Sequence, residues 1–178
     1  MAMSSSSAVT LPTDPLLGPG RGDHAPHKLP PSGDQPQSGT PALALDASIV
    51  IIRWDDHDLI GCGHDLRSDY VERFWLGVLG PATVLMLRRF ARGFAERPDG
   101  FRVHPVDTAA ALGLGRGTGK SSIIARTIDR ACQFGAARIE GPDQLAVRSM
   151  LASLTDRQLA RLPEPVRRAH DRWESHGR

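Results

Sequence analysis

The chain has 178 residues, and its 22 Lys and Arg nearly balance its 20 Asp and Glu, for a formal net charge of +2. Its two cysteines suit a reducing compartment and provide no disulfide framework. No apolar run approaches the roughly 18 residues of a membrane-spanning helix, and the N-terminus lacks the apolar region of a secretory signal. We therefore expect a cytoplasmic protein with no contact to a membrane.

Residues 1–44 are rich in Pro, Gly and Ser and have almost no apolar periodicity. So little apolar surface cannot offset the entropy of ordering the backbone, roughly 1–2 kcal/mol per residue. We expect a disordered tail over 1–44 and a single domain over 45–178. The cell-adhesion tripeptide Arg21-Gly22-Asp23 falls in this tail, and we interpret it as coincidence.

Charge is distributed unevenly along the expected domain. Residues 45–77 carry 3 Arg against 7 acidic residues, a net charge of −4, whereas residues 78–178 carry 17 Lys and Arg against 10 acidic residues, a net charge of +7. A basic half is what a nucleic-acid partner requires. A solvated basic surface would show the same pattern, so both interpretations remain open.

The β-branched run Ile49 to Ile52 predicts a buried strand. Asp, His and Cys side chains then cluster between Asp55 and Asp65, and such side chains can bind a divalent metal. The ligand spacing typical of zinc sites is missing, and acidic residues also suit turns because they accept hydrogen bonds from local backbone N–H groups. We therefore favour a solvated or capping role and predict no metal.

A helix is expected next. Asp69 and Glu72 resemble a capping box, and Gly80-Pro81 ends this helix and begins another. Apolar residues recur between these signals at helical spacing, and we interpret them as core rather than as a surface that stacks on bases: Val71, Phe74, Trp75, Val78 and Leu79.

The stretch from Gly63 to Leu76 (GHDLRSDYVERFWL), followed by Leu79-Gly80-Pro81, resembles the front of a family of uncharacterised actinobacterial proteins. In that family a helix-turn-helix-like segment follows, of the form found here from Phe101 to Val147. The resemblance covers about residues 54–170 and omits the tail. It implies a winged-helix-like domain and brings no activity, because none is established for the family.

Residues 81–148 have the order of a winged helix-turn-helix. The predicted elements are helices over 82–96, from Pro105 to Gly113 and over 121–134, a short strand over 101–103, and a hairpin of 136–140 with 144–148. The predicted fold class is α+β, mostly helical: a winged helix with an additional N-terminal strand and helix and C-terminal helices.

The segment from Gly113 to Ser121 is rich in glycine and resembles a phosphate-binding P-loop. The G-x-x-x-x-G-K-[ST] pattern requires glycine at position 114, which is Leu114, and the segment follows a helix instead of a buried strand. We therefore predict no nucleotide, no cofactor and no catalytic residues.

The helix over 121–134 is the expected recognition helix. Its apolar residues, such as Ile124 and Ile128, face inward, and Arg, Ser and Gln on the other side are residue types that read base edges. Asp129 on the same side would oppose phosphate unless it is paired with a neighbouring arginine. The predicted DNA contacts are Ser122, Arg126, Arg130 and Gln133 in the major groove and Thr118, Lys120, Arg138 and Arg148 on phosphates.

The C-terminal part is expected to be helical. Thr155 and Gln158 form a capping box, and Pro165 begins a last helix in which His170 packs or forms a hydrogen bond. Residues 149–178 would brace the domain or form a dimer contact. The leading hypothesis is a non-catalytic DNA-binding winged-helix protein that regulates transcription. The alternative is a protein-interaction or adaptor module on the same scaffold.

Overall fold

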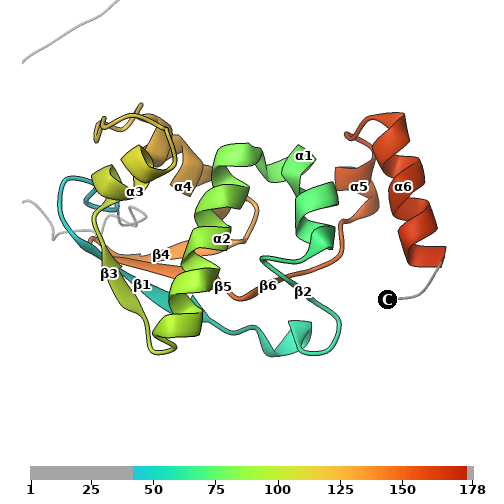
Figure 1. Ribbon diagram of the computed structural model, residues 1–178, viewed down its shortest axis with the longest axis horizontal. Coiled ribbons are helices and arrows are strands. Elements are labelled where there is room, and N and C mark those ends of the chain that lie inside the picture. Colours follow the sequence, from blue (N-terminus) through green and yellow to red (C-terminus); the bar gives the residue numbers. More distant parts are fainter. Residues whose placement is uncertain (1–41, 176–178) are drawn as a thin grey trace, which may run out of the picture. The chain divides into compact units, whose positions relative to one another are not determined.

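The computed structural model describes residues 42–175, which belong to one compact unit of mixed α+β structure (Figure 1). The Arg21-Gly22-Asp23 tripeptide and almost all of the predicted tail lie outside the described residues. Among the residues described, no helix is long and apolar enough to cross a membrane.

A four-stranded sheet lies at one end of this unit. Its strands are β1 (Ile49–Trp54), β3 (Phe101–Val103), β4 (Ala137–Gly141) and β5 (Gln144–Arg148), in the order β3-β1-β5-β4. β1 is antiparallel to β3 and parallel to β5, and β4 and β5 form a hairpin. The predicted strands and hairpin are confirmed. A second, two-stranded sheet joins β2 (His64–Asp65) to β6 (Met150–Leu151).

The two faces of the four-stranded sheet differ because side chains alternate along each strand. On one face Ile49, Ile51 and Leu145 are buried, and Phe101 packs edge-on against Phe94 of α2 (Pro81–Glu96). The opposite face carries half-buried residues of β1, namely Val50, Ile52 and Trp54.

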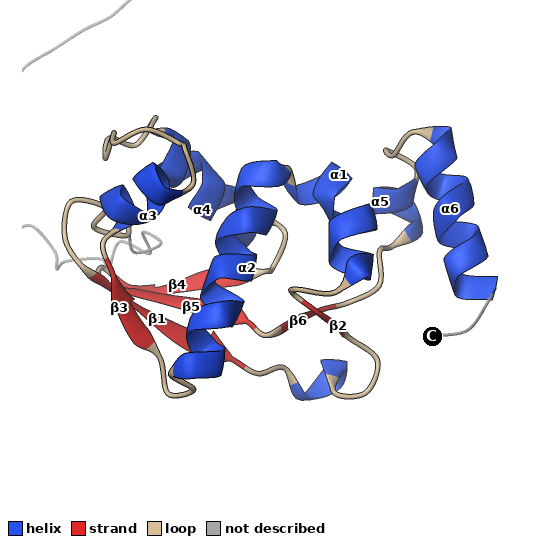
Figure 2. Ribbon diagram, viewed as in Figure 1, coloured by secondary structure: helices blue, strands red, loops and turns tan. Residues whose placement is uncertain are grey.

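Three helices follow the predicted positions closely. After α2 come α3 (Pro105–Ala111) and α4 (Ile123–Gln133), which lie next to each other (Figure 2). α4 begins at Ser122, whose hydroxyl accepts a hydrogen bond from the Ala125 backbone N–H at 3.2 Å. Its inner residues Ile124, Ile128 and Ala131 are buried as predicted.

The segment before α2 departs from the prediction. It begins as a single π-helical turn, η2 (Val71–Trp75), and continues as α1 (Leu76–Leu79). The predicted capping box of Asp69 and Glu72 is wrong. The Val71 N–H donates to the hydroxyl of Ser68 at 3.4 Å, and Glu72 pairs instead with Arg88 of α2 at 2.5 Å. The predicted apolar stripe is nevertheless buried.

The C-terminal helices α5 (Asp156–Leu159) and α6 (Glu164–Ser175) lie at the end of the unit away from α3 and α4 (Figure 1). The capping box of Thr155 and Gln158 is confirmed. α6 packs on η2 through His170, which is buried and hydrogen-bonded to the Tyr70 hydroxyl at 2.8 Å. That hydroxyl also accepts from the Leu154 backbone N–H at 2.9 Å. α6 therefore braces η2.

β1 lies inside the sheet of the predicted winged-helix segment. Residues 81–148 contribute β3, β4 and β5, but β1 separates β3 from the hairpin. The strand that we expected to precede this segment is therefore an integral part of its sheet, and 81–148 is not a self-contained unit.

Candidate nucleic-acid interface

The outward side of α4 and the loop before it carry three of the eight predicted DNA-contacting residues. Arg126, Asp129 and Gln133 are exposed on α4, and Lys120 is exposed in the loop before it. None of these four side chains makes a hydrogen bond or ion pair with another residue in the described part of the chain, 42–175. We call them the α4 surface. Asp129 is not paired with an arginine, so it remains a negative charge on this surface.

Two further predicted DNA contacts, Thr118 and Ser122, lie near the α4 surface but are less exposed than its residues. Thr118 is half-buried in the loop before α4. The Ser122 hydroxyl accepts a hydrogen bond from the Ala125 N–H, so it caps the helix. Sequence reasoning assigned Ser122 to the outward side but did not recognise it as the cap.

Arg130 turns away from the α4 surface towards the preceding helices. Its Nε and Nη2 donate to the backbone carbonyl of Val78 at 3.1 and 2.5 Å, and its guanidinium carbon lies 5.3 Å from the centre of the Phe134 ring. The Val78 carbonyl is near the end of α1, where helices leave carbonyls without partners. Arg130 therefore joins α4 to α1, and we no longer count it among base-reading residues.

Arg138 and Arg148 lie on the opposite face of the sheet from α4, around the Trp54 ring. Their guanidinium carbons are 4.3 and 4.1 Å from the ring centre. Arg138 pairs with Glu140, and Arg148 pairs with Asp56. We call these five residues the Trp54 cluster. The structure does not bring these two arginines together with the α4 surface, so their predicted phosphate contacts would lie apart from those of Lys120 and Thr118.

A groove that sequence reasoning missed lies between the start of α2 and α4. It has a volume of about 270 Å³, and its lining includes Pro81, Ala82, Thr83, Arg126 and Arg130. We call it the α2–α4 groove. The signal in the sequence is Gly80-Pro81, because glycine offers the helix no capping side chain and proline contributes no N–H.

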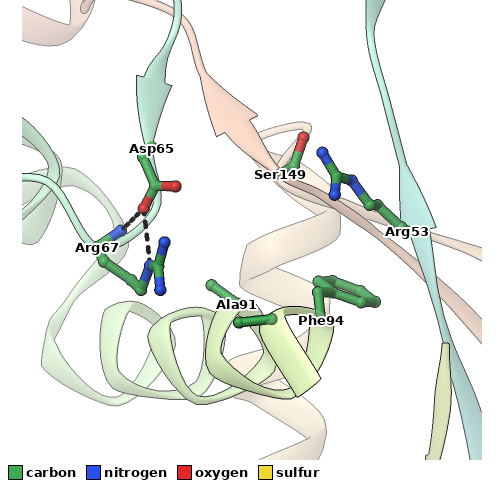
Figure 3. A pocket seen from close by; sticks show the side chains of 7 residues that line it. Arg53, Asp65, Arg67, Ala91, Phe94 and Ser149 are labelled. Atoms are coloured by element: carbon green, nitrogen blue, oxygen red, sulfur yellow. Dashed lines mark hydrogen bonds and ion pairs between the residues drawn. The ribbon is translucent and has the colours of Figure 1, made fainter. Parts of the chain in front are cut away.

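A second hollow lies between β1, β2 and α2 (Figure 3). Arg53 and Arg67 line it from opposite sides, above Phe94. Asp55 accepts from Arg53 at 2.6 Å, and Asp65 accepts from Arg67 at 3.2 Å. Each guanidinium thus has its own carboxylate, so the hollow provides no excess positive charge for an anionic ligand.

The Asp55–Asp65 cluster forms turns and ion pairs. The Asp56 carboxylate accepts from the Asp58 N–H at 3.1 Å and caps the short helix η1 (His57–Leu59). Burial raises the pKa of Asp55, but hydrogen bonds from Arg53 and Ser149 outweigh it and hold that pKa below its ordinary value. The predicted capping role is confirmed. Among residues 42–175 there is no group of three or more His, Cys, Asp or Glu that could hold a metal.

Comparisons with models of protein families, with curated proteins and with solved structures found no match. A proposal for the function therefore depends on the geometry and charge of these surfaces.

Proposed function

We propose that this chain is a non-catalytic, cytoplasmic DNA-binding protein that regulates transcription. In this proposal α2, β3, α3, α4 and the β4–β5 hairpin form a winged helix, and α4 is its recognition helix. The order of these elements along the chain supports the proposal. The position of β1 between β3 and β5 is a departure from the simplest form of that fold, in which the first strand pairs directly with the hairpin.

The observation that carries the proposal is the α4 surface. Arg126, Gln133 and Lys120 project from one helix and its preceding loop, and internal contacts engage none of them within residues 42–175. Arg and Gln form bidentate hydrogen bonds with guanine and adenine, whereas Lys neutralises phosphate. Exposed Arg116 in the same loop adds a further positive charge.

The contacts within the Trp54 cluster argue against phosphate binding by the β4–β5 hairpin. Its two arginines are engaged by carboxylates and by the Trp54 ring, on the sheet face away from α4. We therefore propose that phosphates are contacted by the loop before α4, through Lys120 and Thr118, and not by the β4–β5 hairpin.

The test compares two doubly substituted full-length chains that lose the same charge. Lys120→Ala with Arg126→Ala removes two cations from the α4 surface, whereas Arg161→Ala with Arg167→Ala removes two exposed cations from the C-terminal region. We expect the first to weaken binding to duplex DNA about tenfold or more, and the second to change it little. Equal affinities of the two variants would reject α4 as the DNA-binding element.

The sheet face around the Trp54 cluster favours a second candidate function, a protein-interaction module. Val50 and Ile52 lie beside Trp54 on this face, and its two arginines are already paired with carboxylates. This face is partly apolar and the Trp54 cluster carries no net charge, although the exposed Arg102, opposite Val50 on β3, adds one cation; such a mixed surface suits a protein partner. This candidate predicts that the full chain shows no DNA binding and captures a protein partner even after nuclease treatment.

A further inference from the structure

The first turn of α2 has two backbone donors that are unpaired within the described chain, and both belong to residues that line the α2–α4 groove. Val84 is the first residue of α2 whose N–H bonds within the chain, donating to the Gly80 carbonyl at 3.1 Å. Pro81 has no N–H, and the N–H groups of Ala82 and Thr83 have no acceptor among residues 42–175. α2 has 16 residues, so these donors also lie at the positive end of a substantial helix dipole.

Thr83 provides an independent indication of a ligand. It is only 2% exposed and lines the groove, yet its hydroxyl makes no hydrogen bond with any described residue. Buried hydroxyls nearly always have a partner. Among residues 42–175, only one side-chain N or O atom is completely buried and lacks a hydrogen-bond partner, and that atom is Arg148 Nε, not the Thr83 oxygen. The Thr83 oxygen therefore keeps a small exposed surface, and Thr83 is among the residues that line the groove.

The charge of the groove favours an anion. Arg126 and Arg130 line it, and no Asp or Glu is among its lining residues. The Arg130 side chain is held by the Val78 carbonyl, whereas the Arg126 side chain has no hydrogen bond or ion pair with the rest of the described chain. The groove volume of about 270 Å³ is several times the roughly 30 Å³ that one water occupies, which leaves room for a tetrahedral oxyanion.

We infer that the α2–α4 groove binds a phosphate group. The N–H groups of Ala82 and Thr83 and the Thr83 hydroxyl donate to its oxygens, and Arg126 neutralises its charge. A free phosphate and a DNA phosphate have the same chemistry. The assignment to a DNA backbone therefore rests on the proposed function. In this inference Arg126 contacts the phosphate backbone in place of the base contact proposed above, which leaves Gln133 as the base-reading residue of α4.

The inference is tested by amide NMR on the full chain, titrated separately with inorganic phosphate and with a short DNA duplex. We expect both to shift the Ala82 and Thr83 amide signals in a saturable manner, with DNA effective at lower concentration. Arg126→Gln should weaken phosphate binding roughly tenfold, the effect of losing one charged hydrogen bond, and Arg167→Gln should leave it unchanged. Thr83→Val should weaken it as well, and Thr83→Ser should restore it because serine retains the hydroxyl.

The outcomes separate this site from DNA binding as a whole. If neither phosphate nor DNA moves the Ala82 and Thr83 signals, the site is rejected. If DNA binds and shifts α4 signals while those two stay still, the site is rejected and DNA binding stands. If phosphate shifts them and Arg126→Gln abolishes the effect, but duplex DNA does not bind, the site stands for a free phosphate and the proposed function fails.

Discussion

Arg148 illustrates how contacts within the fold decide the role of an arginine in the basic half of the chain. Its side chain is 21% exposed, it pairs with Asp56, and it stacks on the Trp54 ring. The Arg126 side chain, by contrast, makes no hydrogen bond or ion pair in the described part of the chain. Both were equally plausible as DNA contacts from the sequence, because neither Trp54 nor Asp56 is a sequence neighbour of Arg148.

Arg148→Ala is predicted to lower the free energy of unfolding by about 1–3 kcal/mol, because it leaves Asp56 without its partner and removes the stacked guanidinium. Arg138→Ala is the comparison: its guanidinium also lies over the Trp54 ring, but its side chain is 54% exposed, so its ion pair with Glu140 should contribute below about 1 kcal/mol. Urea denaturation measures both values. Equal losses in the two variants would contradict a structural role for Arg148.

Asp55 predicts a pH dependence of stability. Hydrogen bonds from Arg53 and Ser149 outweigh the effect of burial and hold the pKa of Asp55 below its ordinary value of 3.8. The folded state therefore favours the ionised carboxylate, which stabilises the fold above that value and ceases to do so as pH falls through the folded-state pKa. The contribution is small because the Asp55 side chain is 53% exposed.

Asp55→Asn should accordingly be less stable than the natural chain near neutral pH. The difference should shrink as pH falls from about 6 to about 2, since the carboxylate is then protonated in both states. Urea denaturation at a series of pH values measures this, and a difference that stays constant over that range would exclude Asp55 as its source.

At the level of single elements, local signals predicted helices and strands well when the deciding contacts were local. The Ser122 to Gln133 region and the Thr155–Gln158 capping box depend on neighbours within four residues, and both formed near the predicted positions. The π-helical turn at Val71–Trp75 was not predicted from local signals. Glu72 is held by Arg88, sixteen residues along the chain, and a contact at that separation cannot be read from local spacing.

Gly93 tests the packing between α2 and β3. Alanine normally stabilises a helix interior by about 1 kcal/mol relative to glycine. A Cβ at Gly93, however, would lie 2.4 Å from Cζ of Phe101 and within 2.9 Å of two further ring carbons. We expect Gly93→Ala to destabilise the fold by about 1–3 kcal/mol, because the ring must move.

Gly119→Ala is the matched control for this substitution, since a Cβ there meets nothing within 4 Å. It should leave the thermal unfolding temperature nearly unchanged. A rise in that temperature for Gly93→Ala would show that Phe101 is not packed against α2 as described.

At the scale of the whole unit, the sequence predicted the mixed α+β class but not the way in which the strands pair. The run Ile49 to Ile52 indicated a buried strand, yet nothing local specified that β1 would pair with β5 across some ninety residues (Val50 with Gln144, Trp54 with Arg148). Two parts of the candidate site depend on similar distant contacts. Trp54 holds the hairpin arginines, and the α2–α4 groove joins helices about forty residues apart.

The central position of β1 predicts that residues 81–148 do not fold alone. Without β1, the strands β3 and β5 lose the element that both of them pair with. We expect a fragment of residues 81–148 to give the poorly dispersed amide NMR spectrum of an unfolded chain, and a fragment of residues 42–178 to give a dispersed one. A dispersed spectrum from the shorter fragment would show that β1 is dispensable.

The most direct test of the central proposal is the salt dependence of DNA binding by the full chain, measured by fluorescence anisotropy with a random-sequence duplex. We expect the logarithm of the association constant to fall linearly with the logarithm of salt concentration, by about 0.9 for each phosphate neutralised. Substituting Lys120 and Arg126 together with alanine should reduce that slope by about 1–2. No binding at low salt, or an unchanged slope in this variant, would contradict a role for α4 and its loop in contacting DNA.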